Sequence, residues 1–256
     1  TFLSMLIDSH CHLLDERLDA EEEIARMPED GLFAVVENGF DLSSSRRASA
    51  LAEGHAGVYC AVGCHPEEAA GFEKGHVDEY LALAALPKTV AVGEIGLDYC
   101  YEIAPRSVQR QVFITQLEMA HRAKKPVNLH IRDAYGDAFA ILSECRELLE
   151  NGVLLHCYGG SREMAERFSE FDAYFAFGGV ITFKNAKKDD IVRAVPKDRL
   201  LAETDCPYMT PVPFRGQVNR PAYVRYVVEK MAQILGVTFD EAERLTAENA
   251  RRYYGF

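Results

Sequence analysis

The sequence predicts an α/β protein of the (β/α)8 TIM-barrel type, with residues 1–256 forming one domain. Three observations lead to this prediction. Eight short apolar runs recur along the chain, segments of helical period lie between them, and the length of 256 residues is close to the roughly 250 that such barrels use. No low-complexity linker or shift in composition divides the chain into two parts.

The eight apolar runs are expected to be strands. Each is too short for a helix, is rich in β-branched residues and is bounded by Gly, Asp or His. Their apolarity is nearly continuous, which is typical of parallel strands covered on both faces. The predicted strands are Met5–Ser9, Leu32–Glu37, Val58–Val62, Thr89–Val92, Val127–Leu129, Val153–Leu155, Tyr174–Phe177 and Leu200–Ala202.

Helical periodicity is clearest in four segments. Val108–Ala123 and Ala138–Leu149 carry apolar residues at spacings of three and four, and Pro126 stops the first of these before the next strand. Pro221 can open a helix that Gly236 closes. The last helix is expected to begin at Thr238, because Glu241 three residues later completes a capping box.

The structural competitor is a doubly wound open sheet. Such folds usually carry a glycine-rich phosphate loop after the first strand, whereas this chain reads Asp8-Ser9-His10-Cys11-His12 at that position. The barrel is therefore the favoured architecture.

Composition limits the class of function. The net charge of −12 opposes binding along a nucleic-acid backbone through a broad basic face. The seven cysteines include no CxxC pair, so we expect a reducing cytoplasmic location. No apolar run is long enough to span a membrane, and no stable protein partner is indicated. Met5 looks like a natural start, so Thr1–Ser4 are expected to be added residues or the trace of an alternative start.

In such barrels the chemistry lies where the strands end, at the carboxyl-terminal rim. His10 and His12 follow the first apolar run at positions that share one face of an extended chain, so both imidazoles can reach one metal ion. Other residue types that bind metals follow four further runs. They are Glu94, His130, His156 and Asp205.

These six side chains predict a centre with two metal ions. Converging buried polar groups are costly unless a cation or a complete hydrogen-bond network satisfies them, and six ligands suit two ions about 3.5–4 Å apart. His10, His12 and Asp205 would hold one ion and His130 and His156 the other, with Glu94 bridging. The metal can be zinc, manganese or magnesium.

Seven sequence blocks closely resemble the TatD family of metal-dependent hydrolases, and the resemblance runs over nearly the whole chain. It implies an amidohydrolase-type TIM barrel, two divalent metals held by the same six residues, and deoxyribonuclease activity on DNA. It also implies that His65 and Arg132 contact phosphate. The blocks are Asp8–Leu13, Gly63–Pro66, Gly93–Tyr99, His130–Asp133, His156–Gly160, Gly178–Lys184 and Glu203–Tyr208.

The leading hypothesis is hydrolysis of phosphodiester bonds in single-stranded DNA or strand ends by a metal-bound hydroxide. Asp205 is the candidate proton acceptor, with Glu94 as the second catalytic carboxylate. A guanidinium such as that of Arg132 can clamp a phosphate, although a rim salt bridge is an alternative. Just past the rim motifs, Tyr99, Tyr158 and Tyr208 can stack on a base or simply pack in loops.

Two other functions stay open at this stage. The same nucleophile can attack a carbonyl, giving amide, ester or lactone hydrolysis, including deacylation of an acyl-tRNA, because a fold does not select the reaction. Related cyclic-amide hydrolases often carry a modified lysine on the fourth strand where this chain has Glu94, which favours the nuclease. A barrel that binds partners without catalysis is the third reading, and the six intact ligand positions argue against it.

Overall fold

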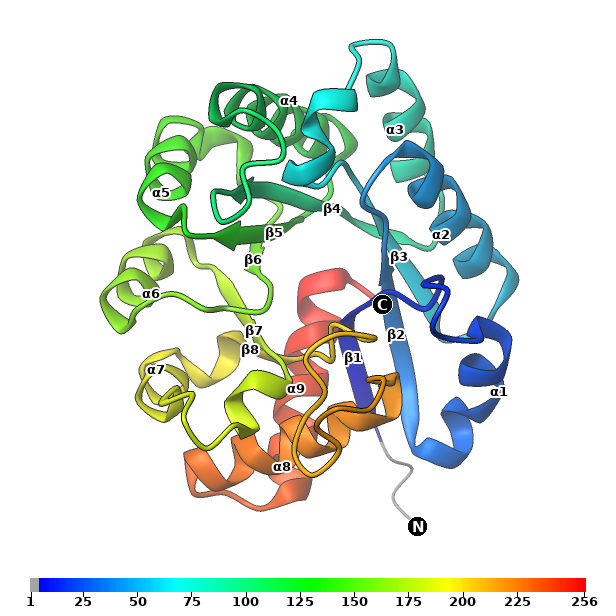
Figure 1. Ribbon diagram of the computed structural model, residues 1–256, viewed down its shortest axis with the longest axis vertical. Coiled ribbons are helices and arrows are strands. Elements are labelled where there is room, and N and C mark those ends of the chain that lie inside the picture. The colour runs from blue at the N-terminus through cyan, green and yellow to red at the C-terminus, as the bar shows by residue number, and fades with distance from the viewer. Residues whose placement is uncertain (1–4) are drawn as a thin grey trace.

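A computed structural model describes residues 5–256 as a barrel of eight parallel strands surrounded by helices (Figure 1). The strands pair in chain order from β1 to β8, so the predicted (β/α)8 fold is confirmed. The expectation for Thr1–Ser4 falls outside the described residues.

The strands agree with the predicted runs and differ mainly at their carboxyl ends. Four of them, β1, β2, β4 and β5, continue beyond the predicted run into polar residues toward the rim. The strands are β1 Leu6–Cys11, β2 Leu32–Asn38, β3 Val58–Val62, β4 Thr89–Asp98, β5 Val127–Arg132, β6 Val153–Leu155, β7 Tyr174–Phe177 and β8 Leu200–Ala202.

Helices follow the strands and cover the outside of the barrel. Short 3-10 turns also occur, among them η1 Pro66–Gly71 after β3 and η2 Arg146–Leu148 before β6. The α-helices are α1 Ala20–Asp30, α2 Leu42–Gly54, α3 His76–Ala84, α4 Arg106–Ala123, α5 Tyr135–Glu144, α6 Arg162–Phe168, α7 Asp189–Ala194, α8 Val224–Leu235 and α9 Phe239–Tyr254.

Local signals set most helix ends as predicted. Thr238 and Glu241 form the capping box at the start of α9, and Gly236 ends α8 in the left-handed conformation with φ 67°. The predicted helix Ala138–Leu149 is wrong at its end, because α5 stops before Cys145 and the chain tightens into η2. A 3-10 turn keeps the spacing of three that the apolar pattern contains, which explains the error.

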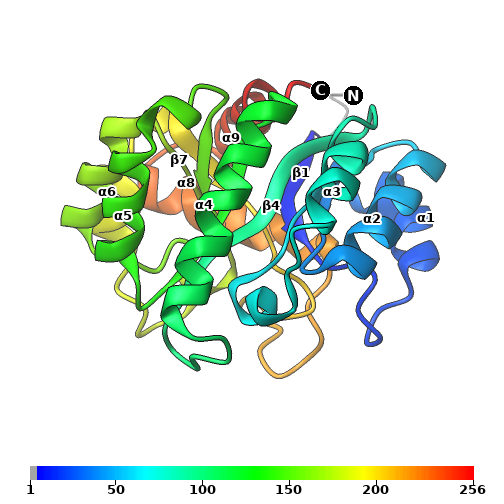
Figure 2. The ribbon, with the colours of Figure 1, turned by 90° about the horizontal axis from the view of Figure 1, so that it is seen from above.

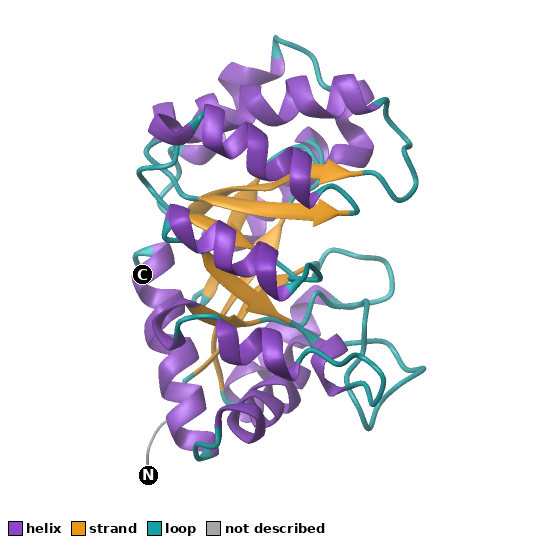
Figure 3. Cartoon of the chain, turned by 90° about the vertical axis from the view of Figure 1, so that its left-hand side faces the viewer, coloured by secondary structure: helices purple, strands orange, loops and turns teal. Residues whose placement is uncertain are grey.

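The interior of the barrel is closed at its amino-terminal end by the last helix. One apolar cluster consists of strand side chains together with Ala247, Ala250, Tyr253 and Tyr254 of α9. The Tyr253 hydroxyl donates to the carbonyl oxygen of Val127 at 2.7 Å. Figure 2 shows α9 leading to the C-terminus, and Figure 3 shows the long loops on the side of the barrel opposite the C-terminus.

At the opposite, carboxyl-terminal end of the barrel, the segment that follows β8 pairs with the end of β1. Two backbone hydrogen bonds join the segments there, from Asp205 N to His10 O and from His12 N to Cys206 O, both at 2.9 Å. These two hydrogen bonds bring three of the predicted metal ligands together through the backbone itself.

No helix among residues 5–256 is long and apolar enough to cross a membrane.

Candidate metal centre

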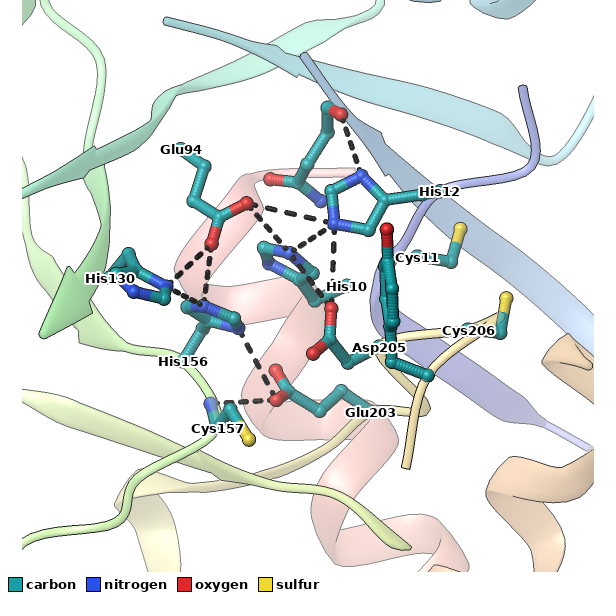
Figure 4. A network of polar contacts seen from close by, with 12 residues as sticks. His10, Cys11, His12, Glu94, His130, His156, Cys157, Glu203, Asp205 and Cys206 are labelled. Carbon is teal, nitrogen blue, oxygen red and sulfur yellow. Dashed lines mark hydrogen bonds and ion pairs between the residues drawn. The ribbon is translucent and has the colours of Figure 1, made fainter. Parts of the chain in front are cut away.

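The six side chains predicted as metal ligands meet at the rim (Figure 4). Five of them line one pocket, and the fully buried His10 contacts His12 and Glu94 from below its surface. His10, Glu94 and His130 belong to strands, whereas His12 and His156 directly follow β1 and β6. The pocket has a volume of about 1170 Å³ and is open to solvent on its loop side.

Four donor atoms form a first group. They are Nε2 of His10, Nε2 of His12, Oδ1 of Asp205 and Oε2 of Glu94. The two imidazole nitrogens lie 3.3 Å apart, and each lies between 3.4 and 3.7 Å from both carboxylate oxygens. Nitrogen and oxygen ligands bound at about 2.0–2.2 Å to one ion stand roughly 3.0–3.6 Å apart. The spacing therefore fits a single cation between these atoms.

The other oxygen of Glu94 belongs to a second group. Its Oε1 lies 2.8 Å from Nε2 of His156 and 3.0 Å from Nδ1 of His130, and these two nitrogens are 3.3 Å apart. Glu94 thus directs one carboxylate oxygen to each group, which is the arrangement expected of a bridging carboxylate (Figure 4).

Hydrogen bonds outside the groups fix the orientation of two imidazoles. Nδ1 of His12 lies 3.1 Å from the carbonyl oxygen of Asn38, and Nε2 of His130 lies 2.9 Å from Oδ2 of Asp98. Both oxygens can only accept, so in the neutral ring the remaining nitrogen presents a lone pair to its group. A divalent cation placed between these lone pairs and the carboxylate oxygens would remove their mutual repulsion, so the donor set fits divalent metal ions.

Glu203 faces His156 from the side away from Glu94. Its Oε1 accepts a hydrogen bond from the backbone N–H of Cys157 at 2.6 Å and lies 3.5 Å from Nδ1 of His156. Nδ1 of His156 and Oε2 of Glu203 have no hydrogen-bond partner among the described residues. We read Glu203 as an orienting carboxylate of the kind that commonly supports metal-bound histidines.

Sequence reasoning missed these orienting groups. Asp98 and Glu203 stand in the same sequence blocks as Glu94 and Asp205, but the residue pattern does not show which histidine each one meets. The carbonyl of Asn38 carries no sequence signal, because every residue has a carbonyl. The pairing of β1 with β2 and of β4 with β5 defines the contacts of Asn38 and Asp98, and the segments that follow β6 and β8 define the contact of Glu203.

Charge in the site is concentrated on buried groups. Burial favours the neutral form of Glu94, but the His156 and His10 imidazoles hold the pKa of this carboxyl well below its usual range. Burial also lowers the pKa of His12, but the carboxylates of Asp205 and Glu94 outweigh it and raise the pKa to about 10. The carboxylates therefore favour positive charge at this place.

Two positions at the rim adopt a backbone conformation that side chains disfavour. Asp205 has φ 54° and Cys157 has φ 42°, and residues with a side chain in the left-handed region are uncommon and concentrate at functional sites. At Gly96, with φ 144°, a Cβ atom would lie 2.0 Å from the carbonyl oxygen of His130. Glycine is required there for β4 to approach the strand that carries His130.

His65 lies beside the second group. Its Nε2 is 3.7 Å from Oε1 of Glu94, and its Nδ1 accepts a hydrogen bond from the N–H of Glu67 at 3.2 Å. Burial lowers the pKa of His65 to about 3, so the ring is neutral and carries its proton on Nε2. The side chain can therefore donate a hydrogen bond into the pocket.

Arg132 ends β5 and lines the pocket. Its guanidinium lies 4.8 Å from the centre of the Tyr101 ring, and within residues 5–256 it forms no ion pair with Asp133 or Glu94. The alternative of a rim salt bridge is therefore wrong in this structure, and the cation faces the pocket.

The three tyrosines considered as base-stacking groups differ from one another. Tyr99 and Tyr158 are buried, and their hydroxyls donate to Asp137 and to the carbonyl oxygen of Ser161, so these two pack in loops. Tyr208 is 47% exposed and lines the pocket.

Comparison with known proteins gives consistent results. Residues 7–255 match the family described as TatD related DNase. The chain is 40% identical over 253 residues to the uncharacterized metal-dependent hydrolase YabD of Bacillus subtilis, covering 98% of this chain and 99% of that protein. It is 28% identical over 243 residues to the 3'-5' ssDNA/RNA exonuclease TatD of Klebsiella pneumoniae, covering 93% and 92%.

Among solved structures, the crystal structure of YJJV, a TatD homolog from Escherichia coli, superposes with a TM-score of 0.90. That protein is 29% identical in sequence, and the alignment covers 100% of both chains. The two proteins therefore share the same fold over their full aligned length.

Proposed function

The chain belongs to the TatD-related DNase family of metal-dependent hydrolases, and from this premise we propose that it hydrolyses phosphodiester bonds in single-stranded DNA or at strand ends. The relative from Klebsiella pneumoniae, named as a single-stranded DNA and RNA exonuclease, supports this substrate class.

The observation that carries the proposal is the divided carboxylate of Glu94. One of its oxygens lies within the group of His10, His12 and Asp205, and the other lies between His130 and His156. We assign one divalent cation to each group, with Glu94 shared. When bound, a pair of such cations activates water as a nucleophile and neutralises negative charge on a phosphoryl group.

Asp205 is the proposed proton acceptor. Its carboxylate is largely buried, lines the pocket and lies 3.4 Å from Nε2 of His12. The pKa of this carboxyl is lowered, because contacts with His12 and His10 outweigh the effect of burial. It is therefore ionised at neutral pH and able to take a proton from the attacking water.

His65 and Arg132 are the proposed phosphate contacts. The neutral ring of His65 presents an N–H toward the second group, and Arg132, which forms no ion pair within the described residues, brings a cation to the lining of the same pocket. Both can donate hydrogen bonds to phosphoryl oxygens, and donors already in position stabilise charge that develops during the reaction.

The negative charge around the pocket favours a substrate that contacts the protein through only one or two phosphates. The pocket is lined by Glu16, Glu67 and Glu68 in addition to the site carboxylates, while Asp15 is paired with Arg17, and the whole chain carries a net charge of −12. A long phosphate backbone would be repelled by these groups. A strand end that presents one or two phosphates to Arg132 and the cations avoids this repulsion.

The test is a substrate comparison with protein purified without chelator. We expect cleavage of end-labelled single-stranded DNA that depends on added divalent metal, with little turnover of a panel of esters, lactones and N-acyl compounds. Turnover of that panel with DNA left intact would reverse the assignment in favour of carbonyl hydrolysis.

A further inference from the structure

Large apolar side chains that are strongly exposed concentrate at the catalytic end of the barrel. Seven such side chains occur among residues 5–256, and six of them lie on loops that follow strand ends: Phe40, Tyr101, Ile103, Tyr208, Val212 and Val218. The seventh, Phe33, lies near the start of β2 at the opposite end. Two of the six, Phe40 and Tyr208, also line the pocket of the proposed metal centre.

Tyr208 is the member of this set that lies closest in sequence to a proposed metal ligand, three residues after Asp205. Its ring is 6.3 Å from the ring of His12, centre to centre, in an edge-to-face arrangement. It also lines the pocket that contains Glu94 and Asp205. A flat group placed on Tyr208 would therefore stand beside the proposed metal centre.

The backbone holds Tyr208 in a fixed position. Its N–H donates to the carbonyl oxygen of Asp205 at 2.9 Å. The side chain of Asn219, which is fully buried, donates to the carbonyl oxygens of Tyr208 and Thr204 at 2.6 and 2.9 Å. The ring is thus exposed on a segment that is tied to the core, so its exposure does not result from a loosely held loop.

A second side chain covers part of the Tyr208 ring. The guanidinium of Arg17 lies 4.4 Å from the ring centre and forms two hydrogen bonds of 2.8 Å to the carboxylate of Asp15. Because Asp15 neutralises the charge of Arg17, this arginine is a poor phosphate ligand. Its geometry instead supports the aromatic ring from one side.

We propose that Tyr208 is a stacking platform for the nucleobase next to the scissile phosphate, with Arg17 and Asp15 as positioning residues. The inference rests on the nuclease activity proposed above and adds how the substrate is held. Aromatic platforms accept any base, because every base has a π-face, and they require that the base be unpaired. The platform therefore selects single strands and frayed ends without reading their sequence.

The Tyr101 and Arg132 pair differs from the Tyr208 and Arg17 pair in one decisive respect. Arg132 faces Tyr101 but has no carboxylate partner within the described residues, so its charge is available for a phosphate. Arg17 has its charge compensated by Asp15. The two pairs therefore have different roles in substrate binding: Arg132 binds the phosphate, and Tyr208 stacks on the base.

Phe33 provides a matched control. It is 45% exposed, close to the 47% of Tyr208, and the guanidinium of Arg251 lies 4.2 Å from its ring centre. The two sites present the same kind of aromatic and arginine pair at opposite ends of the barrel. Replacing Tyr208 or Phe33 by leucine removes a similar ring in each case.

The experiment measures kcat and KM on a single-stranded oligonucleotide for the wild type, Tyr208→Leu, Tyr208→Phe and Phe33→Leu. It also uses oligonucleotides with an abasic residue placed in turn at each of the terminal nucleotides. Loss of one stacked base corresponds to about a fivefold to hundredfold loss of binding. We expect Tyr208→Leu to raise KM by such a factor, with Tyr208→Phe and Phe33→Leu close to wild type.

The abasic series separates stacking from a structural role. At one position the missing base should weaken the wild type by the same factor as Tyr208→Leu, and the variant should lose nothing further on that substrate. Arg17→Gln should raise KM less, and its effect should disappear in the double variant with Tyr208→Leu.

The outcomes distinguish the two levels of the proposal. If the wild type cleaves DNA while Tyr208→Leu and Phe33→Leu behave alike, the platform is refuted and the nuclease assignment stands. If every abasic position affects the wild type and Tyr208→Leu equally, the platform is likewise refuted. A wild type that neither binds nor cleaves the oligonucleotides overturns both.

Discussion

The two ends of the barrel use the same kinds of residue for opposite purposes. At the amino-terminal end, Tyr253 and Tyr254 fill the interior and each hydroxyl reaches a backbone carbonyl. At the carboxyl-terminal end, buried imidazole nitrogens face the carboxylate of Glu94: Nε2 of His10 lies 3.4 Å from one of its oxygens and Nε2 of His156 lies 2.8 Å from the other. The two tyrosine hydroxyls are thus paired with the backbone, whereas the donor atoms at the other end converge on positions that fit a cation.

Backbone conformation repeats this contrast. Lys124, with φ 54°, ends α4 and hydrogen-bonds back to the helix, which is an ordinary use of the left-handed region. Asp205 has the same φ of 54° in the middle of the proposed metal centre. The comparison indicates that stability and chemistry are assigned to separate ends, as is common in barrels of this kind. The following variants test that separation.

The largest effect is expected for Asp205→Asn. Asparagine tolerates the left-handed backbone as aspartate does, so the fold should be kept, whereas the amide cannot accept the proton. We expect turnover of single-stranded DNA to fall about a thousandfold, with a thermal unfolding midpoint near that of the wild type. Normal turnover would show that Asp205 is not the proton acceptor.

Asp98→Asn should have the next largest effect. The carboxylate of Asp98 accepts hydrogen bonds from His130 and from the N–H of Cys100, and an amide can serve only one of these. Loss of such an orienting group lowers metal affinity or activity by about tenfold to a hundredfold. Titration of the metal-free protein with Zn²⁺ or Mn²⁺ measures the affinity, and an unchanged value would exclude an orienting role for Asp98.

Arg132→Ala should act on substrate binding. We expect KM to rise about tenfold with little change in kcat, because a charged hydrogen bond to phosphate is lost. Arg132→Lys should recover only part of the loss, since it lacks the planar fork. Arg251→Ala, which removes the matched arginine at the other end, should leave KM unchanged; equal effects of the two alanine variants would contradict the separation.

The smallest effect on activity is expected at the amino-terminal end. In Tyr254→Phe the carbonyl oxygen of Ser9 loses its hydroxyl donor, and Asn128 loses an acceptor. Leaving a buried acceptor unsatisfied costs about 1–3 kcal/mol of unfolding free energy, which denaturant unfolding can measure. The kcat of the folded variant should stay within about twofold of wild type, and a large loss of kcat would show that this end takes part in the chemistry.

The sequence was sufficient to predict the barrel because its strands are apolar runs with clear limits. It also predicted which residues gather at the rim, since parallel strands all end on one side. It placed the end of β4 too early, at Val92, because the strand continues through the polar positions Glu94 and Asp98. A prediction based on apolar runs does not include strand residues that are polar because they face the pocket at the rim.

The finer details of the site depend on tertiary contacts. Nothing in the pattern showed that Asp98 meets His130 or that Glu203 faces His156. The residue pattern likewise did not separate the buried Tyr99 from the exposed Tyr208, because both follow a rim motif in the same way. These distinctions require knowledge of which loop packs against which strand.

Metal content is the most direct test of the central claim that six side chains gather around two divalent cations. The protein should be purified without chelator, loaded with metal, freed of excess ions and measured by elemental analysis. We expect two ions per chain in the wild type and in Tyr254→Phe, and fewer in Glu94→Ala, which removes the carboxylate shared by both groups. A wild type without metal, or a Glu94→Ala variant that keeps both ions, would contradict the account.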